Sequence, residues 1–155
     1  MQIPLQGARQ CHAVRYEIRQ NPITLYACHC TECQRQSGTA FSLSLVVQRE
    51  ALQLVAGKPR EWLRQTDSGR TVSCLFCGSC GTRLYHEPHA NNAITIVKPG
   101  TLDDKSWLKP VGHIWICSAQ PWFSIPTDSL LYDGQPPDLS ALTAAWKATD
   151  AEARL

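Results

Sequence analysis

The chain has 155 residues, of which 43% are hydrophobic and 18% are charged, and this length suits one ordinary domain with its own core. Its formal net charge of +2 shows no strong electrostatic preference. A dedicated nucleic-acid binder usually carries a basic block or stripe, whereas the basic residues here are scattered and indicate a solvated face: Lys58, Arg60, Arg64 and Arg70. We therefore expect no nucleic-acid partner.

The first ten residues, MQIPLQGARQ, lack a charged segment followed by an apolar run, so no signal peptide is predicted. No stretch approaches the ~18 consecutive apolar residues that a membrane span requires. The sequence thus predicts a cytoplasmic protein without a membrane partner. Cytosolic thiols stay reduced, and clustered cysteines in that setting favour metal ligation over disulfides.

Short segments in which apolar and polar residues alternate predict β-strands along most of the chain. The candidate strands are, in order, AVRYEI (13–18), TLYACH (24–29), AFSLSLVV (40–47), TVSCLF (71–76), AITIV (93–97) and GHIWIC (112–117). Gly, Pro, Asn and Asp residues separate these segments, as is typical of turns and loops. The sequence therefore predicts one all-β domain built from hairpins, over residues 4–134.

The C-terminal tail, residues 135–155, differs from the rest because it follows a Pro-Pro break and is rich in Ala and Leu. Asp138 or Ser140 is a candidate N-cap for a short helix. Three apolar side chains would then lie roughly on one face: Leu139, Leu142 and Trp146. We interpret this helix as packed on the sheet or fraying at the terminus, with partner binding as the alternative.

Two of the eight cysteines, Cys77 and Cys80, frame a C-x-x-C turn closed by Gly81, which has the form of a zinc knuckle. One knuckle supplies two of the four ligands of a closed structural site, and the N-terminal segment offers Cys11 as a third. A metal ion that joined Cys11 to Cys77 would close a loop of more than sixty residues. Such a cross-link removes much chain entropy.

Three further cysteines, Cys28, Cys30 and Cys33, form a C-x-C-x-x-C motif. A dication at ~2.3 Å from each sulfur would explain why three thiols crowd into one short turn. Three ligands leave the fourth tetrahedral position open, which is typical of a reactive zinc rather than a structural one. His29 should point away from the sulfurs, as a hydrogen-bond donor behind a ligand, as an exposed residue or as a packing residue.

Five motifs occur in order along the chain: GARQCHAVRYE, CHCTECQRQSG, FCGSCGTRL, GTLDD and GHIWICSAQPWF. Together they resemble the glutathione-dependent formaldehyde-activating enzyme family, which also includes centromere protein V, from about Gly7 to Tyr132. The resemblance implies a β-tent fold: antiparallel sheets with zinc sites that join their loops. It also implies a four-cysteine structural zinc and a three-cysteine zinc near the substrate site.

Two positions depart from the family pattern, in which C-x-C precedes GAVRY. When the chain is aligned on AVRY, Cys11 is the second cysteine, Arg9 takes the place of the first, and His12 falls where the family has a glycine. Arginine cannot ligate zinc because its guanidinium stays protonated, so the structural site keeps Cys11, Cys77 and Cys80. Three repairs stay open: His12 as fourth ligand, a water molecule, or a metal-free cluster with Arg9 paired to thiolates.

Cys74 is a spare cysteine three residues before Cys77 on a predicted strand. Side chains alternate along a strand, so Cys74 should face the other way, beside Val72 and Phe76. We interpret it as a small core residue rather than a fourth ligand.

The resemblance implies a carbon–sulfur lyase or synthase that acts on an adduct of glutathione or another small thiol, such as S-(hydroxymethyl)glutathione. The zinc held by Cys28, Cys30 and Cys33 would lower the pKa of the thiol, whose sulfur then attacks an electrophilic carbon such as that of formaldehyde. Arg35 is the best-placed cation for the carboxylates of glutathione, and Arg83 is the second candidate. The expected assembly is a monomer or a homodimer.

Two other functions stay open at this point. A thiol redox enzyme would use Cys117, at the end of an apolar segment, somewhat like zinc-bearing β-tent sulfoxide reductases; otherwise Cys117 is a buried strand residue. A zinc-stabilised, non-catalytic binding module is the second alternative. Its stacking surface would include Trp115 and Trp122, which a small all-β core also explains.

Overall fold

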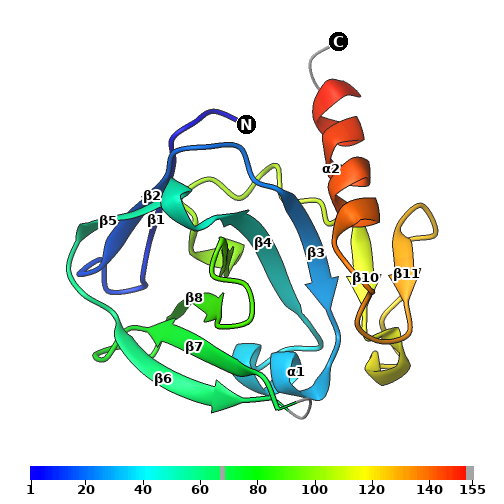
Figure 1. The fold of residues 1–155 in the computed structure, drawn as a ribbon, viewed down its shortest axis with the longest axis horizontal. Helices are drawn as coiled ribbons and strands as arrows, with labels where there is room; N and C mark the ends of the chain where they lie inside the picture. The colour runs from blue at the N-terminus through cyan, green and yellow to red at the C-terminus, as the bar shows by residue number, and fades with distance from the viewer. Residues whose placement is uncertain (67–68, 153–155) are drawn as a thin grey trace. The chain divides into compact units, whose positions relative to one another are not determined.

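The computed structural model describes residues 1–66 and 69–152. The chain divides into two compact units, and Figure 1 shows the whole ribbon coloured by residue number. Unit 1 comprises Met1–Pro22 and Val46–Trp107, and unit 2 comprises Ile23–Leu45 and Leu108–Leu155. No described helix is both long enough and apolar enough to cross a membrane.

Unit 1 consists of two antiparallel sheets. The first has the order β1 (Leu5–Ala8), β2 (Arg15–Ile18) and β5 (Leu52–Ala56). The second has the order β9 (Ile94–Val97), β8 (Arg83–Pro88), β7 (Thr71–Phe76) and β6 (Arg60–Gln65). Two short 3-10 turns, η1 (Arg49–Ala51) and η2 (Pro99–Thr101), complete the unit.

The strand β2 shows how sequence alternation produces the core of unit 1. Tyr16 and Ile18 are fully buried, while Arg15 and Glu17 between them are only half-buried, as a period of two requires. The buried Tyr16 hydroxyl lies 2.7 Å from Thr101 Oγ1, so its polar atom is paired.

Unit 2 contains β11 (Leu130–Tyr132), β10 (Gly112–Ile114), β3 (Thr24–Cys28) and β4 (Ser42–Gln48), whose residues from Val46 onward belong to unit 1. It also contains α1 (Thr31–Ser37), the 3-10 turn η3 (Ile116–Ser118) and α2 (Ser140–Glu152). The strand β10 runs parallel to both β3 and β11, whereas only antiparallel pairing was expected. Parallel neighbours need long connections rather than tight hairpins, and long segments do separate these strands in the sequence.

The helix α2 starts at Ser140, where Asp138 Oδ1 accepts a hydrogen bond of 2.7 Å from the Ser140 backbone N–H. Both predicted cap residues therefore take part in the N-terminus of the helix. Leu142 and Trp146, one turn apart, are buried, and Figure 1 shows α2 (red) beside β10 (yellow). At Gly112 of β10 a Cβ would collide with Leu142 Cδ2, so the helix approaches a bare backbone there.

The fold class is confirmed: both units are mainly β-sheet and the chain ends in a short helix. All six predicted strands are present, but the last ends at Ile114 rather than Cys117, because Trp115 has a left-handed φ of 58° and η3 follows. The sequence missed β1, β5, β6, β8 and β11. Most side chains of β5 and β6 are exposed, so these two strands lack the alternation that marks a half-buried strand. The proposed domain boundary between residues 134 and 135 stays a prediction.

Candidate metal centres

Six cysteines form two groups of three, one in each unit. Within each group the sulfur atoms lie within 4.8 Å of one another. A tetrahedral zinc ion with Zn–S distances of ~2.3 Å holds its sulfur ligands about 3.8 Å apart, so the spacing in both groups is compatible with a metal ion. The two groups are the ones predicted from the sequence: Cys28, Cys30 and Cys33 in unit 2, and Cys11, Cys77 and Cys80 in unit 1.

The group in unit 2 lies where β3 passes into α1. Cys28 is the buried last residue of β3, and Cys30 is the N-cap of α1, where its sulfur accepts a 3.4 Å hydrogen bond from the Cys33 backbone N–H. The helix has seven residues, none of them buried, and ends at Gly38 with a left-handed φ of 65°. Such a short helix is marginal by itself, so it needs contacts with neighbouring segments to hold it in place.

The three thiols of this group share hydrogen bonds among their sulfurs. Contacts from Cys28 and then Cys33 lower the pKa of Cys30 to about 2, while the contacts with Cys30 and Cys33, together with burial, raise the pKa of Cys28. Burial, followed by the neighbouring Cys28, also raises the pKa of Tyr26 on β3, so this phenol stays neutral. Without a metal ion the negative charge of the group is therefore favoured on Cys30, while Cys28 stays a protonated thiol, and a bound cation would be needed to hold the sulfurs as thiolates.

His29 is fully buried, so of the three roles expected for it the exposed one is wrong and the packing role holds. Its Nε2 lies 2.8 Å from Nδ1 of His113, which is also buried. The ring of His29 packs against Phe41 and Phe123, with centroids 5.2 and 5.5 Å away. Burial lowers the pKa of both histidines, which favours the neutral form of each ring. The backbone N–H of His29 donates to Ile114 O at 2.9 Å, and this bond fixes the backbone between the flanking residues Cys28 and Cys30.

Gln34 on α1 is a site residue that sequence reasoning missed. Its amide nitrogen donates to His29 O at 2.7 Å and to Ser118 O at 2.9 Å, and its amide oxygen accepts from Gln120 Nε2 at 2.8 Å. Gln34 therefore ties α1 both to the backbone next to Cys28 and to the segment after β10. In the sequence, only its position directly after Cys33 pointed to a role at this site, and no local pattern distinguishes it from a surface glutamine.

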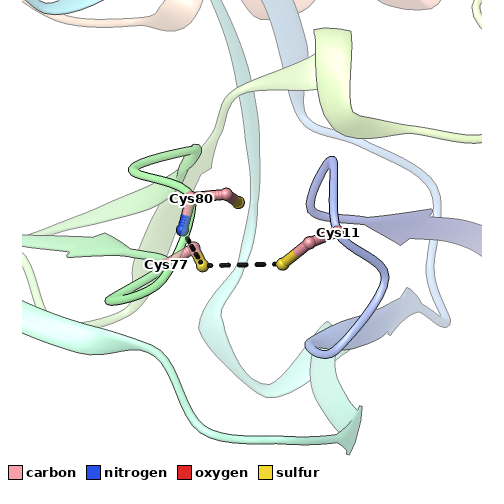
Figure 2. A group of neighbouring side chains, drawn as sticks. All are labelled: Cys11, Cys77 and Cys80. Atoms are coloured by element: carbon pink, nitrogen blue, oxygen red, sulfur yellow. Dashed lines mark hydrogen bonds between the residues drawn. The ribbon is translucent and has the colours of Figure 1, made fainter.

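The group in unit 1 brings together two loops, as Figure 2 shows. Cys77 is buried, and its sulfur accepts backbone hydrogen bonds from Ser79 (3.1 Å) and Cys80 (3.0 Å), the pattern of a zinc knuckle. Cys11, on the loop between β1 and β2, is exposed, with its sulfur 3.9 Å from that of Cys77. A hydrogen bond with Thr82 is the main reason why the pKa of Cys80 is lowered to about 6.

Arg9 lies against this group, where the family has a cysteine. The side chain is buried and its Nη1 donates to Cys77 Sγ at 2.6 Å. His12 is exposed and does not belong to the group that the described residues form. Its left-handed φ of 56° is the conformation that a glycine adopts without strain, which explains the glycine that the family has at this place. Of the three repairs considered, the contact between Arg9 and the sulfur favours the metal-free one.

Two cysteines lie outside both groups. Cys74 is fully buried on β7, as expected for a small core residue. Cys117 was expected to be a buried strand residue, and this is wrong: it is exposed on η3 because the chain leaves the strand at Trp115. Its sulfur lies 3.6 Å from Ser118 Oγ, a hydroxyl that cannot serve as a resolving thiol.

The two candidate arginines for substrate binding have different surroundings. Arg35, in the last turn of α1, is exposed and forms an ion pair of 2.7 Å with Glu32. Arg83 lies in unit 1, with its guanidinium over the rings of Trp62 and Phe76 at 5.8 and 5.9 Å from their centroids.

The family model described as glutathione-dependent formaldehyde-activating enzyme matches residues 4–118. Two similar fungal proteins are named, provisionally, as glutathione-dependent formaldehyde-activating enzymes. The one from Penicillium rubens is 28% identical over 111 residues, which cover 67% of this chain and 57% of that protein. The one from Colletotrichum graminicola is 26% identical over 161 residues, which cover 92% of this chain and 83% of that protein. The chain thus spans less than two thirds of the length of the first relative.

A crystal structure of a Rhodobacter sphaeroides protein is similar in fold, with a TM-score of 0.52 and 23% identity. The match covers 68% of this chain and 91% of that one. The family model matches well over half of the chain, in the region that holds both cysteine groups. The chain therefore belongs to the glutathione-dependent formaldehyde-activating enzyme family.

Proposed function

We propose that the chain is a zinc-dependent carbon–sulfur lyase or synthase that acts on an adduct of glutathione or another small thiol. S-(hydroxymethyl)glutathione is the first candidate substrate. The observation that carries the proposal is the group of three sulfurs from Cys28, Cys30 and Cys33, because three ligands leave one tetrahedral position for an incoming thiol. Membership of the family supports glutathione and formaldehyde as the reactants.

The donor set of unit 2 fits zinc. Three thiolates at this spacing select a soft or borderline cation such as Zn²⁺ over Mg²⁺ or Ca²⁺, which prefer oxygen ligands. When bound, zinc supplies a Lewis acid that lowers the pKa of a thiol and keeps it as thiolate at neutral pH. Cys28, Cys30 and Cys33 would hold it, and the hydrogen bonds of His29 and Gln34 would keep the ligand-bearing backbone in place.

The proposed reaction forms or breaks one carbon–sulfur bond. In the synthetic direction the thiol sulfur attacks the carbonyl carbon of formaldehyde, the π electron pair moves to oxygen, and that oxygen takes up the proton released by the thiol. The lyase direction reverses each change. No oxidant or reductant is required, which distinguishes this proposal from a redox role for Cys117.

Arg35 stays our candidate for contacting a carboxylate of glutathione. It lies two residues after Cys33 on the same helix, and its ion pair with Glu32 is exposed to solvent. Exposed ion pairs contribute only ~0–1 kcal/mol, so a substrate carboxylate could exchange with Glu32 at little cost. A cytoplasmic location and a monomeric or homodimeric state remain predictions.

Zinc content and the response of the metal site to glutathione test the proposal. Wild type is compared with the triple variant Cys28→Ser, Cys30→Ser, Cys33→Ser, by elemental analysis and by X-ray absorption at the zinc edge. We expect the triple variant to lose one zinc per chain, and glutathione to add a sulfur ligand to the wild-type spectrum. If the variant keeps all its metal and glutathione changes nothing, the non-catalytic binding module becomes the better explanation.

A further inference from the structure

We propose that Arg9 takes the place of the metal ion in the cysteine group of unit 1. Its guanidinium and the Cys77 sulfur would form a buried clamp between the β1–β2 loop and the β7–β8 loop. The chain would then bind one zinc ion, in unit 2, where a four-cysteine member of the family would bind two. This inference does not depend on which reaction unit 2 performs.

The sulfur of Cys77 is the atom for which a metal ion and Arg9 would compete. Besides its bond to Cβ, a thiolate sulfur has three lone pairs that can meet donors or a metal. Backbone N–H groups of Ser79 and Cys80 approach it at 3.1 and 3.0 Å, and Arg9 Nη1 approaches at 2.6 Å. A zinc ion at ~2.3 Å from the same sulfur would need one of these directions. The two amide bonds belong to the knuckle itself, so metal and guanidinium compete for the third.

Burial of Arg9 makes this competition unequal. The side chain is 8% exposed, its guanidinium keeps its charge in any protein environment, and its Nε has no hydrogen-bond partner within the described residues. If a metal ion displaced Nη1 from Cys77, a buried cation would lose its anionic partner and would face a dication. Leaving a buried charge unpaired is strongly unfavourable.

The contact between Arg9 and Cys77 also joins the two loops that a structural zinc ion would otherwise join. It joins two residues 68 positions apart in the sequence, and charge-assisted hydrogen bonds of this kind are the strong ones. Beside it, Gln10 N donates to Thr82 Oγ1 at 3.4 Å, so a second bond links the same two loops. With the loops already joined, Cys11 and Cys80 would not be required as metal ligands.

The experiment removes the metal site of unit 2, so that any remaining metal reports on unit 1. In the background Cys28→Ser, Cys30→Ser, Cys33→Ser, the full chain is prepared with Arg9 and with Arg9→Cys. Each protein is titrated with Co²⁺, whose thiolate charge-transfer and d–d bands report tetrahedral sulfur ligation. We expect no such bands with Arg9, and one tightly bound equivalent with Arg9→Cys. Bands of equal intensity and equal affinity in both proteins would overturn the proposal.

A second measurement uses the intact wild-type protein and does not depend on how the variants fold. Zinc-loaded protein is treated with iodoacetamide, and alkylation is mapped to each cysteine by mass spectrometry. We expect one zinc per chain, rapid alkylation of Cys11, and protection of Cys30 and Cys33. Two zinc ions per chain, with Cys11 protected until a chelator is added, would contradict the clamp.

Arg9→Lys separates the charge of the clamp from its geometry. Lysine keeps the positive charge but offers a point charge on a flexible stem instead of a planar fork. We expect this variant to stay free of metal in unit 1 and to unfold at a lower temperature than wild type. Metal binding by Arg9→Lys as tight as that by Arg9→Cys would show that charge does not exclude the ion, and would overturn the proposal.

Discussion

The cysteine group of unit 2 comes from six consecutive positions, whereas that of unit 1 joins Cys11 to a turn that starts 66 residues later. In unit 2 the thiols are close because a strand passes directly into a helix, and a cation would be needed to hold all three as thiolates. In unit 1 the thiols are close because two loops meet, and anything that holds the loops together keeps them so. We therefore expect the local group of unit 2 to depend on a metal ion more than the group of unit 1 does.

The largest expected effect follows from removing one sulfur of the local group. Cys33→Ser should lose the zinc of unit 2 and slow the formation of S-(hydroxymethyl)glutathione by more than about 100-fold, since in the proposed function Cys33 is one of three ligands of the ion that activates the thiol. The rate can be measured by NMR exchange between free formaldehyde and the adduct. The control is Cys117→Ser, which changes an exposed cysteine outside both groups. Loss of activity in the control, with Cys33→Ser still active, would favour the redox enzyme instead.

Removal of the metal should affect the two cysteine groups differently within one protein. The helix α1 has no buried residue, Cys30 is its N-cap and Cys33 lies within it, so a chelator should lower amide-exchange protection in residues 28–38 by at least about 10-fold. The knuckle at residues 77–82 should keep its protection, because the bond from Arg9 stays in place. Hydrogen exchange read by mass spectrometry covers both segments in a single experiment. Equal loss of protection in both segments would show that both depend on metal.

What the sequence could predict follows the same division between local and non-local features. Strands with a buried and an exposed face, such as β2, are visible as alternation, and C-x-C-x-x-C is visible because all three ligands lie within one turn. Pairing of Arg9 with a thiolate was one of the predicted repairs, but Cys77 in particular could not be predicted, because two hairpin loops bring it to Arg9. The alignment on AVRY placed Arg9 at a ligand position, but only the structure shows which sulfur it contacts.

The exposure of Cys117 illustrates a different limit. Its segment, GHIWIC, reads as a continuous apolar strand, yet the left-handed backbone at Trp115 turns the chain into η3. A positive φ at tryptophan is imposed by tertiary contacts, not by local preference. His113 was missed for a related reason: a histidine within an apolar strand gives no sign that another buried histidine faces it.

The variant Gln34→Ala tests whether a metal ion alone holds the helix α1 and its cysteines in position. Gln34→Ala removes hydrogen bonds to His29 O, Ser118 O and Gln120, which should reduce the free energy of unfolding by about 1–3 kcal/mol. Chemical denaturation of the zinc-loaded protein measures this loss. Gln120→Ala removes only one of the three bonds and should lower the same quantity by about 0.5–1.5 kcal/mol. If neither variant lowers the free energy of unfolding, the hydrogen bonds of Gln34 do not position α1 and metal ligation alone does.

The smallest expected effect is the loss of stability in acid that arises from His86, a buried residue of unit 1. Burial, followed by the positive charges of Lys98, Arg83 and Arg64, lowers the pKa of His86 well below its ordinary value of 6.5. In the unfolded chain His86 therefore binds a proton near pH 6.5, whereas in the folded chain it stays neutral at that pH. The free energy of unfolding should accordingly fall as the pH drops below 6.5. The slope from one histidine cannot exceed about 1.4 kcal/mol per pH unit.

Denaturation of wild type and His86→Phe between pH 8 and pH 5 measures this slope, and the variant should show a weaker decline. The buried Nε2 of His86 has no hydrogen-bond partner within the described residues, so an apolar ring of similar size suits the site. His29 and His113 in unit 2 also have lowered pKa values, so part of the acid sensitivity should persist in His86→Phe. An unchanged slope in the variant would place the whole effect in unit 2, where acid also protonates the cysteine ligands and releases the metal.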